Sequence, residues 1–231
     1  MKIAIVAAMR EELAPFRQRL GMTTVVFKQG KTVIEQVCDQ LYLVESGIGK
    51  ANAAATSAWL CHIVQPDVII NTGSTGSFVR DVALGDVVVS TDFRYSDVDA
   101  TGFDYEWGQV PQMPAHYPVE AKWLERVRAH FAATETRYQV HYGQIATSDS
   151  FMSDVATTSA IQAKLPHIVA SDMESAAIAQ IAASYRIPVL NIRGISDYVG
   201  EEATVLFKES LALASENAFD AVWQLTEQLV K

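Results

Sequence analysis

Acidic residues follow two short apolar runs of the sequence that read as buried strands. Asp172 and Glu174 come shortly after the run 167–170, and Asp197 comes shortly after the run 188–192. Because α/β sheets bind their ligands at the carboxyl ends of their strands, we expect these carboxylates to lie in a site. There they could exchange protons with a ligand or accept its hydrogen bonds.

Glu174 also opens an alanine-rich segment, 175–179, that reads as a helix. A carboxylate at a helix start has a second explanation, because it can act as a simple charge partner for the helix dipole. This alternative stays open for Glu174. Asp197 is harder to explain in structural terms alone.

Apolar runs that read as strands alternate with segments of helical spacing along most of the chain. Strands are predicted at 3–7, 23–27, 32–38, 40–44, 68–71, 87–90 and 138–146, and helices at 10–20, 51–63, 123–131 and 204–230. Strands that alternate with helices, after antiparallel strands in the first third, predict a mostly parallel twisted sheet covered on both faces. The glycine-rich segment 46–50 lacks the spacing of a nucleotide-binding loop and reads as a tight turn.

The segment 95–118 is long for a loop and carries several aromatic, glycine and proline residues. Loops of this length in compact domains tend to be functional or to pack against something. Its apolar side chains would otherwise form an exposed patch of the kind that marks a partner site. We therefore expect it to pack at a two-fold homodimer interface.

Composition limits the class of protein. With 231 residues, about half of them apolar (49%), the chain can bury a sizeable core, and we expect one domain over residues 1–231. A formal charge of -9 without a Lys/Arg run argues against a nucleic-acid partner and fits a neutral or cationic small substrate better. The apolar start 3–9 is too short to span a bilayer and has no cleavage pattern, so we expect no membrane partner and a cytoplasmic location.

Cysteine and histidine residues do not indicate a disulfide framework or a metal site. Cys38 and Cys61 are too few and too far apart for a framework, and we expect both to be reduced thiols. The five histidines lack metal-ligand spacing. We expect no metal and no cofactor.

Four strings of the sequence resemble the motifs of the 5′-methylthioadenosine/S-adenosylhomocysteine nucleosidases, a family of the nucleoside phosphorylase superfamily. They are AAMREE at 7–12, NTGS at 71–74, ME at 173–174 and RGISD at 193–197. The likeness runs in order from Lys2 to the last helix. It implies a nucleoside phosphorylase-like fold, a three-layer α/β/α sandwich with a central twisted mixed sheet. It also implies hydrolysis of the N-glycosidic bond of methylthioadenosine and S-adenosylhomocysteine, in methionine salvage and the activated methyl cycle.

The resemblance assigns catalytic roles to three carboxylates. Asp197 would give a proton or hydrogen bond to N7 of adenine, positioned by Ser196, and would need burial to hold that proton near neutral pH. Glu174 would accept hydrogen bonds from the ribose hydroxyls and favour the cationic sugar of the transition state. Glu12 would act as general base on the attacking water, whereas Glu11 reads as a solvated charge at the helix start.

The resemblance also implies substrate-binding residues. Phe151 would stack on adenine, the backbone of Met152 would read its amino edge, and Met173 would line the ribose. Each of these three could instead be plain core. Met9, Ile48, Phe103 and Phe207 would surround the 5′ group, with Tyr105 near the mouth, Pro111 reaching over from a partner subunit, and Ser74, Gly76 and Arg193 completing the site.

Two departures from the family pattern and two rival functions remain. Asp172 stands where many relatives carry Glu, and Ser77 where many carry Gly, so any contact made from position 172 is in doubt. A phosphorylase would use phosphate in place of water, but the carboxylates of Glu11 and Glu12 would repel phosphate. A non-catalytic nucleoside-binding module would have little use for costly buried carboxylates. The preference among methylthioadenosine, adenosylhomocysteine, deoxyadenosine and futalosine-type nucleosides is left open.

Overall fold

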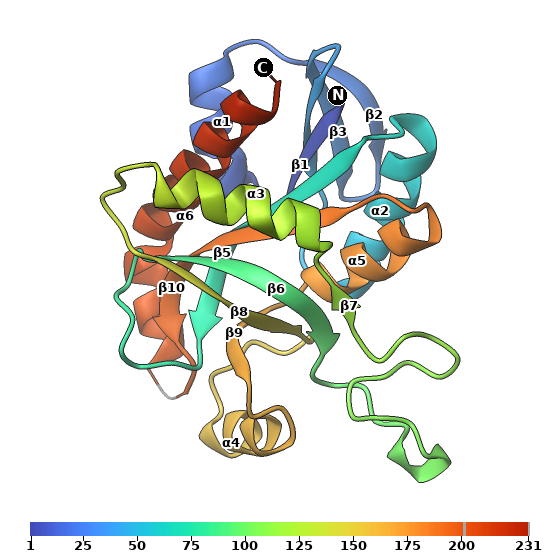
Figure 1. Ribbon diagram of the computed structural model, residues 1–231, viewed down its shortest axis with the longest axis vertical. Coiled ribbons are helices and arrows are strands. Elements are labelled where there is room, and N and C mark those ends of the chain that lie inside the picture. The colour runs from blue at the N-terminus through green and yellow to red at the C-terminus, as the bar shows by residue number, and fades with distance from the viewer. Residues whose placement is uncertain (201, 231) are drawn as a thin grey trace.

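The computed structural model describes residues 1–200 and 202–230, and a ten-stranded mixed sheet runs through it (Figure 1). Its strands, in chain order, are β1 (Ile3–Ala7), β2 (Thr24–Gln29), β3 (Thr32–Cys38), β4 (Leu41–Glu45), β5 (Val68–Ser77), β6 (Val87–Tyr95), β7 (Tyr117–Pro118), β8 (Val140–Thr147), β9 (Ile168–Asp172) and β10 (Val189–Tyr198). The helices are α1 (Arg10–Leu20), α2 (Lys50–Ile63), η1 (Thr101–Phe103, a 3-10 turn), α3 (Ala121–Ala132), α4 (Val155–Lys164), α5 (Ser175–Ser184) and α6 (Ala203–Val230).

Pairing between the strands brings the ends of β5, β9 and β10 together. The order is β10-β6-β8-β9-β5-β1-β4-β3-β2, with β7 beside β6 and a further pairing of β10 with β5. Strands β4, β1, β5 and β10 run parallel, whereas the end of β5 pairs antiparallel with β9 through Gly76 and Ser77. Strands β5, β10, β6, β8 and β9 therefore form a closed ring, and β1, β4, β3 and β2 extend the sheet from β5.

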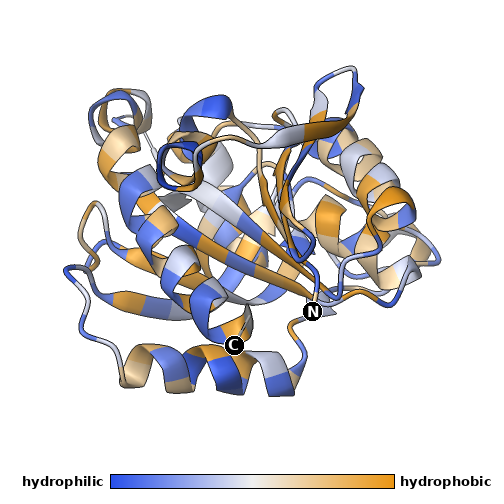
Figure 2. Ribbon diagram, turned by 90° about the horizontal axis from the view of Figure 1, so that it is seen from above, coloured by the Kyte–Doolittle hydropathy of each residue, from blue (hydrophilic) through white to orange (hydrophobic). Residues whose placement is uncertain are grey.

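Helices cover both faces of the sheet, which confirms the predicted α/β/α sandwich. Helices α1 and α6 lie together on one side, and α2 and α5 lie together on the other (Figure 1). The helices alternate between hydrophobic and hydrophilic residues along their length, as expected for elements with one buried face (Figure 2). Among the described residues, no helix combines the length and the apolar character needed to cross a membrane.

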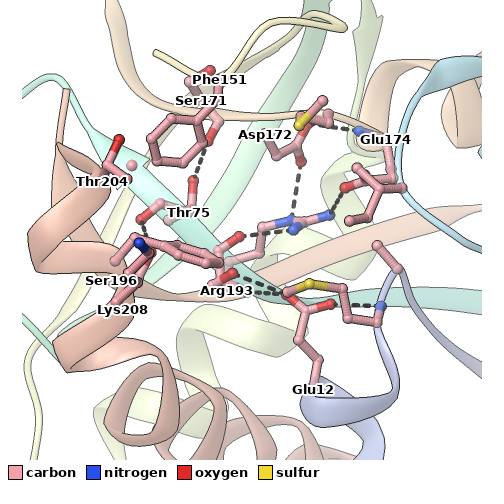
Figure 3. Close-up of a pocket in the computed structure, with 17 residues that line it drawn as sticks. Glu12, Thr75, Phe151, Ser171, Asp172, Glu174, Arg193, Ser196, Thr204 and Lys208 are labelled. Atoms are coloured by element: carbon pink, nitrogen blue, oxygen red, sulfur yellow. Dashed lines mark hydrogen bonds and ion pairs between the residues drawn. The ribbon is translucent and has the colours of Figure 1, made fainter. Parts of the chain in front are cut away.

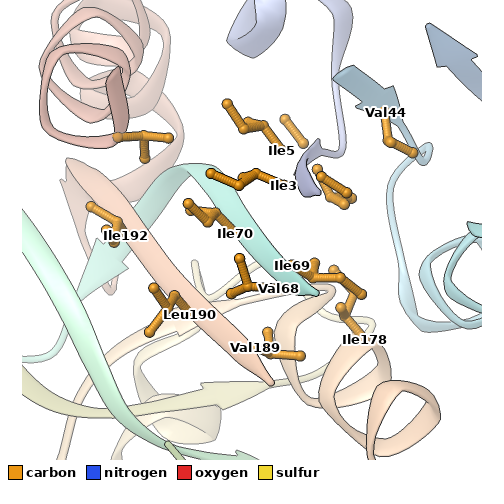
Figure 4. Packing of buried hydrophobic residues seen from close by; sticks show 14 of the residues in the cluster. Ile3, Ile5, Val44, Val68, Ile69, Ile70, Ile178, Val189, Leu190 and Ile192 are labelled. Atoms are coloured by element: carbon orange, nitrogen blue, oxygen red, sulfur yellow. The ribbon is translucent and has the colours of Figure 1, made fainter. Parts of the chain in front are cut away.

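The core lies where the central parallel strands meet the helices (Figure 4). Ile5 of β1, Ile70 of β5 and Ile192 of β10 are fully buried, as expected for continuous apolar strands covered on both faces. Helix α6 packs so closely on β10 that a Cβ added at Gly194 would collide with the backbone of Ala214. This contact holds the middle of α6 against β10.

The predicted strand ends at 71 and 192 are wrong. Strand β5 continues to Ser77 and β10 to Tyr198, and the two stay paired up to that point. Asp197 therefore lies within β10, and Asp172 is the last residue of β9. The reason is that residues 72–77 and 193–197 are mostly small or polar and lack the apolar pattern of a buried strand, but they pair with each other and lie buried around a pocket.

The segment after β6 projects away from the body of the molecule, at the lower right of Figure 1. It contains η1, and its base is held by the indole Nε1 of Trp107, which donates a 3.1 Å hydrogen bond to the backbone oxygen of Ser96. Phe103 at its tip is 81% exposed. A large apolar side chain this exposed has no packing role within the chain.

Candidate active site

A pocket of about 370 Å³ lies at the carboxyl ends of β1, β5, β9 and β10 and beside the start of α6 (Figure 3). A smaller cavity of about 30 Å³ shares Gly76, Phe151 and Met173 with it and is also lined by Met152 and Asp197. The predicted site residues that line the larger pocket are Met9, Glu12, Ile48, Ser74, Gly76, Phe151, Met173, Glu174, Arg193, Ser196 and Phe207.

Glu12 is held by donors from two elements. As the third residue of α1 it reaches back to the start of its own helix, where Oε2 accepts a 3.1 Å hydrogen bond from Met9 N. Oε1 accepts hydrogen bonds from the backbone N (2.8 Å) and Oγ (2.9 Å) of Ser74 on β5. Gly73 has φ +132° and no room for a Cβ, which would strike this carboxylate. Glu12 is thus buried and fixed, whereas Glu11 is exposed.

Arg193 joins the acidic residues at the bottom of the pocket. Its buried guanidinium lies 3.0 Å from Asp172 Oδ2 through Nε and 3.2 Å from Glu174 Oε2 through Nη2. Nη1 donates a 2.8 Å hydrogen bond to the backbone oxygen of Ser74. One cation therefore partly neutralises two carboxylates and ties β10 to β5 and β9.

Glu174 is more than a charge at a helix start. It is 3% exposed, and its Oε1 accepts a 3.0 Å hydrogen bond from the backbone N of Gly49 while Oε2 faces Arg193. Burial raises the pKa of Glu174 above its ordinary value, and the charge of Arg193 opposes that rise. The dipole explanation is thus insufficient, because an exposed side chain would serve the dipole as well.

Asp172, which the family pattern left in doubt, has a clear structural role. Its Oδ1 accepts hydrogen bonds from Thr147 Oγ1 (2.6 Å) and from the backbone N of Glu174 (3.3 Å) and Ser175 (3.1 Å). Its Oδ2 accepts from Asn191 and faces Arg193. Asp172 therefore binds backbone N–H groups at the start of α5 and orients Arg193. The sequence signal was an acidic residue just before a helix, which is a common cap.

Asp197 has a different environment. A bulge in the pairing of β5 with β10 brings Asp197 opposite Gly76, and Ser196 Oγ donates a 2.8 Å hydrogen bond to Asp197 Oδ2. A Cβ at Gly76 would come within 2.8 Å of Oδ1, so a glycine is needed beside this oxygen. Burial raises the pKa of Asp197 to about 6, although the Ser196 hydrogen bond lowers it. Asp197 can therefore hold a proton close to neutral pH.

Aromatic and apolar side chains form the rest of the pocket. Phe151 and Phe207 pack edge to face with ring centroids 5.7 Å apart, and Phe151 and Ile48 are 42% and 50% exposed. These surfaces are open to a ligand. Sequence reasoning did not select Thr204 and Lys208 of α6, which also line the pocket. Their only signal in the sequence is spacing, because Phe207 and Lys208 follow Thr204 by three and four residues, as on one face of a helix.

Three predicted residues lie outside both cavities. Phe103, Tyr105 and Pro111 belong to the projecting segment and line neither cavity of their own chain. Their placement near substrate stays a prediction that requires a second copy of the chain. Among the described residues, no group of three or more His, Cys, Asp or Glu side chains is arranged to hold a metal ion.

Comparison with known proteins identifies the family. The family model of the phosphorylase superfamily matches residues 2–227. A 5′-methylthioadenosine/S-adenosylhomocysteine nucleosidase of Bacillus licheniformis is 39% identical over 240 residues, covering 99% of this chain and 100% of that protein. This chain belongs to that nucleosidase family.

Solved structures of the nucleosidase family share the fold described above. A Neisseria meningitidis enzyme in complex with methylthio-immucillin-A has a TM-score of 0.92 and 32% identity over 98% of this chain and 99% of that chain. An enzyme of Colwellia psychrerythraea in complex with adenine has a TM-score of 0.93 and 34% identity over 99% of this chain and 96% of that chain.

Burial of Asp197 predicts a pH-dependent stability. The ordinary pKa is 3.8 and the pKa in the folded protein is about 6. Above pH 6 the carboxylate is therefore charged in both the folded and the unfolded state, and burying this charge destabilises the folded state. This destabilisation develops as pH rises from about 4 to 6, and amounts to on the order of 3 kcal/mol. Asp197→Asn should therefore be more stable than the wild type at pH 8 and equally stable at pH 4, measured by urea unfolding without ligand.

Asp154→Asn is the matched control, because Asp154 is exposed and its hydrogen bonds with Thr157 lower its pKa. This variant should be no more stable than the wild type at pH 8. A stability difference for Asp197→Asn that does not change between pH 4 and pH 8 would contradict the assignment.

Proposed function

We propose that this protein is a metal-independent purine nucleoside N-glycosidase that hydrolyses 5′-methylthioadenosine and S-adenosylhomocysteine. The products are adenine and the methylthioribose or ribosylhomocysteine, as methionine salvage and the activated methyl cycle require. The observation that carries the proposal is the combination of Asp197, with a pKa of about 6, and two further buried carboxylates, Glu12 and Glu174, around two adjoining cavities. The names of its relatives support the same substrates.

The proposed reaction begins at the purine. Protonated Asp197 gives its proton or a hydrogen bond to N7, which makes adenine a better leaving group. Phe151 stacks on the base, the Met152 backbone reads its amino edge, and Gly76 leaves room beside Asp197. This assignment is supported by the cavity that these four residues share.

The sugar and the water are handled at the other end of the pocket. Glu174 accepts hydrogen bonds from the ribose hydroxyls, Met173 lines the ring, and the negative charge of Glu174 favours the cationic sugar of the transition state. Glu12 takes a proton from the attacking water. Ser74 and Arg193 support this role, because Ser74 holds Glu12 and Arg193 in turn holds the backbone of Ser74.

Variants separate these roles. Asp197→Asn should lower kcat by roughly a hundredfold or more, as expected for loss of a general acid. Glu12→Gln should keep substrate binding but lose turnover, whereas Glu174→Ala should weaken both. Calorimetry and steady-state kinetics measure these effects, and equal loss of binding in the two glutamate variants would refute the division of roles.

For the wild type, kcat/KM should fall as pH rises above about 6, because Asp197 of the free enzyme loses its proton there.

Product analysis tests the function itself. Methylthioadenosine should give free methylthioribose with and without phosphate, because the carboxylate of Glu12 at the pocket would repel phosphate. Met9, Ile48 and Phe207 favour a thioether at the 5′ position, so methylthioadenosine should exceed adenosine in kcat/KM by roughly tenfold to a hundredfold. AMP should be nearly inert. A ribose phosphate product would establish the phosphorylase alternative.

The projecting segment supports a homodimer. Phe103 in this segment is 81% exposed, and a large aromatic side chain this exposed fits a surface that a partner covers. In the dimer, Phe103, Tyr105 and Pro111 would complete the 5′ region of the other subunit. We also propose a cytoplasmic location, because both cysteines are free thiols, as is usual in reducing compartments.

The dimer is tested by sedimentation at low micromolar concentration. The wild type should sediment as a dimer, and Phe103→Asp should shift it towards monomer by adding a charge to the interface. Val25→Asp, at an exposed apolar residue of β2, is the matched control and should leave the dimer intact. A wild-type monomer with full activity would overturn the proposal.

A further inference from the structure

Lys208 lines the pocket, and its charged side chain pairs with no other described residue. The other charged lining residues are Glu12, Asp172, Glu174 and Arg193, and each of them is buried and engaged with its neighbours or with backbone N–H groups. Lys208 is exposed, and within residues 1–200 and 202–230 its ammonium makes neither a hydrogen bond nor an ion pair. A free cation at the edge of a pocket can bind an anionic group of a ligand.

The position of Lys208 defines which part of a ligand it can reach. Thr204, Phe207 and Lys208 share one face of α6, on the α6 side of the pocket (Figure 3). Lys208 also lines a groove of about 820 Å³ between α1 and α6, so it lies where the pocket and the groove meet. A substituent too long for the apolar 5′ region would leave the pocket past this ammonium.

We propose that Lys208 binds the α-carboxylate of the amino-acid tail of S-adenosylhomocysteine and so sets the preference between the two substrates. This inference rests on the proposed function. The thioether of S-adenosylhomocysteine would lie among Met9, Ile48 and Phe207, and a short carbon chain would carry the carboxylate outward to the rim of the pocket. Methylthioadenosine ends at the methyl group and has nothing for Lys208 to bind. A phosphate on C5′, as in AMP, would lie deeper, among the apolar side chains.

Electrostatics gives a reason for a cation at this place. Asp172, Glu174 and Glu12 carry more negative charge than the single Arg193 compensates, and the whole chain has a formal charge of -9. A carboxylate entering this field is repelled unless a local cation offsets the repulsion. Lys208 supplies that cation without adding charge at the reacting bond.

The test is the ratio of kcat/KM for S-adenosylhomocysteine to that for methylthioadenosine. An exposed ion pair is weak, so Lys208→Gln should lower this ratio by about two- to fivefold, through KM for adenosylhomocysteine. Lys208→Glu should lower it by about tenfold, because attraction becomes repulsion. Lys208→Arg should retain the wild-type ratio. The difference between Lys208→Gln and wild type should shrink in high salt.

Two controls make the result specific. Lys28→Gln removes the same charge from exposed β2 and should leave the ratio unchanged. The carboxamide of S-adenosylhomocysteine lacks the anion, and its kcat/KM relative to methylthioadenosine should not respond to Lys208→Gln. An unchanged ratio for Lys208→Glu, or an equal response of the carboxamide, would overturn the inference. Failure of the wild type to cleave methylthioadenosine would instead refute the proposed function.

Discussion

The rest of the pocket depends on the buried guanidinium of Arg193. It contacts Asp172, Glu174 and the backbone oxygen of Ser74, and so connects β10 to β9, to the start of α5 and to β5. Loss of this cation would leave two carboxylates buried without a counter-charge, which is strongly unfavourable. Because Ser74 in turn donates two hydrogen bonds to Glu12, the positions of three acidic side chains follow from one cation.

The buried carboxylates differ in how fully they are bonded, and this difference separates structural from chemical roles. Both oxygens of Asp172 are occupied by donors of the protein, so this carboxylate serves α5 and Arg193. Asp197 has a protein donor only at Oδ2, within the described part of the chain, and its burial raises its pKa to about 6. An incompletely bonded acid in a cavity lowers stability, which fits a group kept for chemistry.

Much of the fold could be predicted because apolar patterns are local. The runs 3–7 and 32–38 coincide with β1 and β3, and helical spacing gives α1 its observed bounds. The ends of β5 and β10 could not be predicted, because their polar residues are buried by pairing with each other and by contacts with segments distant in the sequence. The contact of β9 with β5, which closes the ring of strands, joins segments about a hundred residues apart and leaves no periodic signal.

The sequence by itself determined the family, the α/β architecture and the acidic residues Glu12, Glu174 and Asp197, because residue types and their order are sufficient for these. The tertiary structure decided how each residue is used. Asp172 binds backbone N–H groups at the start of α5 and orients Arg193, Lys208 lines the pocket without a partner among the described residues, and Phe103 lies outside the pocket of its own chain. The physical reason is that burial, counter-charge and hydrogen-bond partners are supplied by segments distant in the sequence, and only packing brings them together.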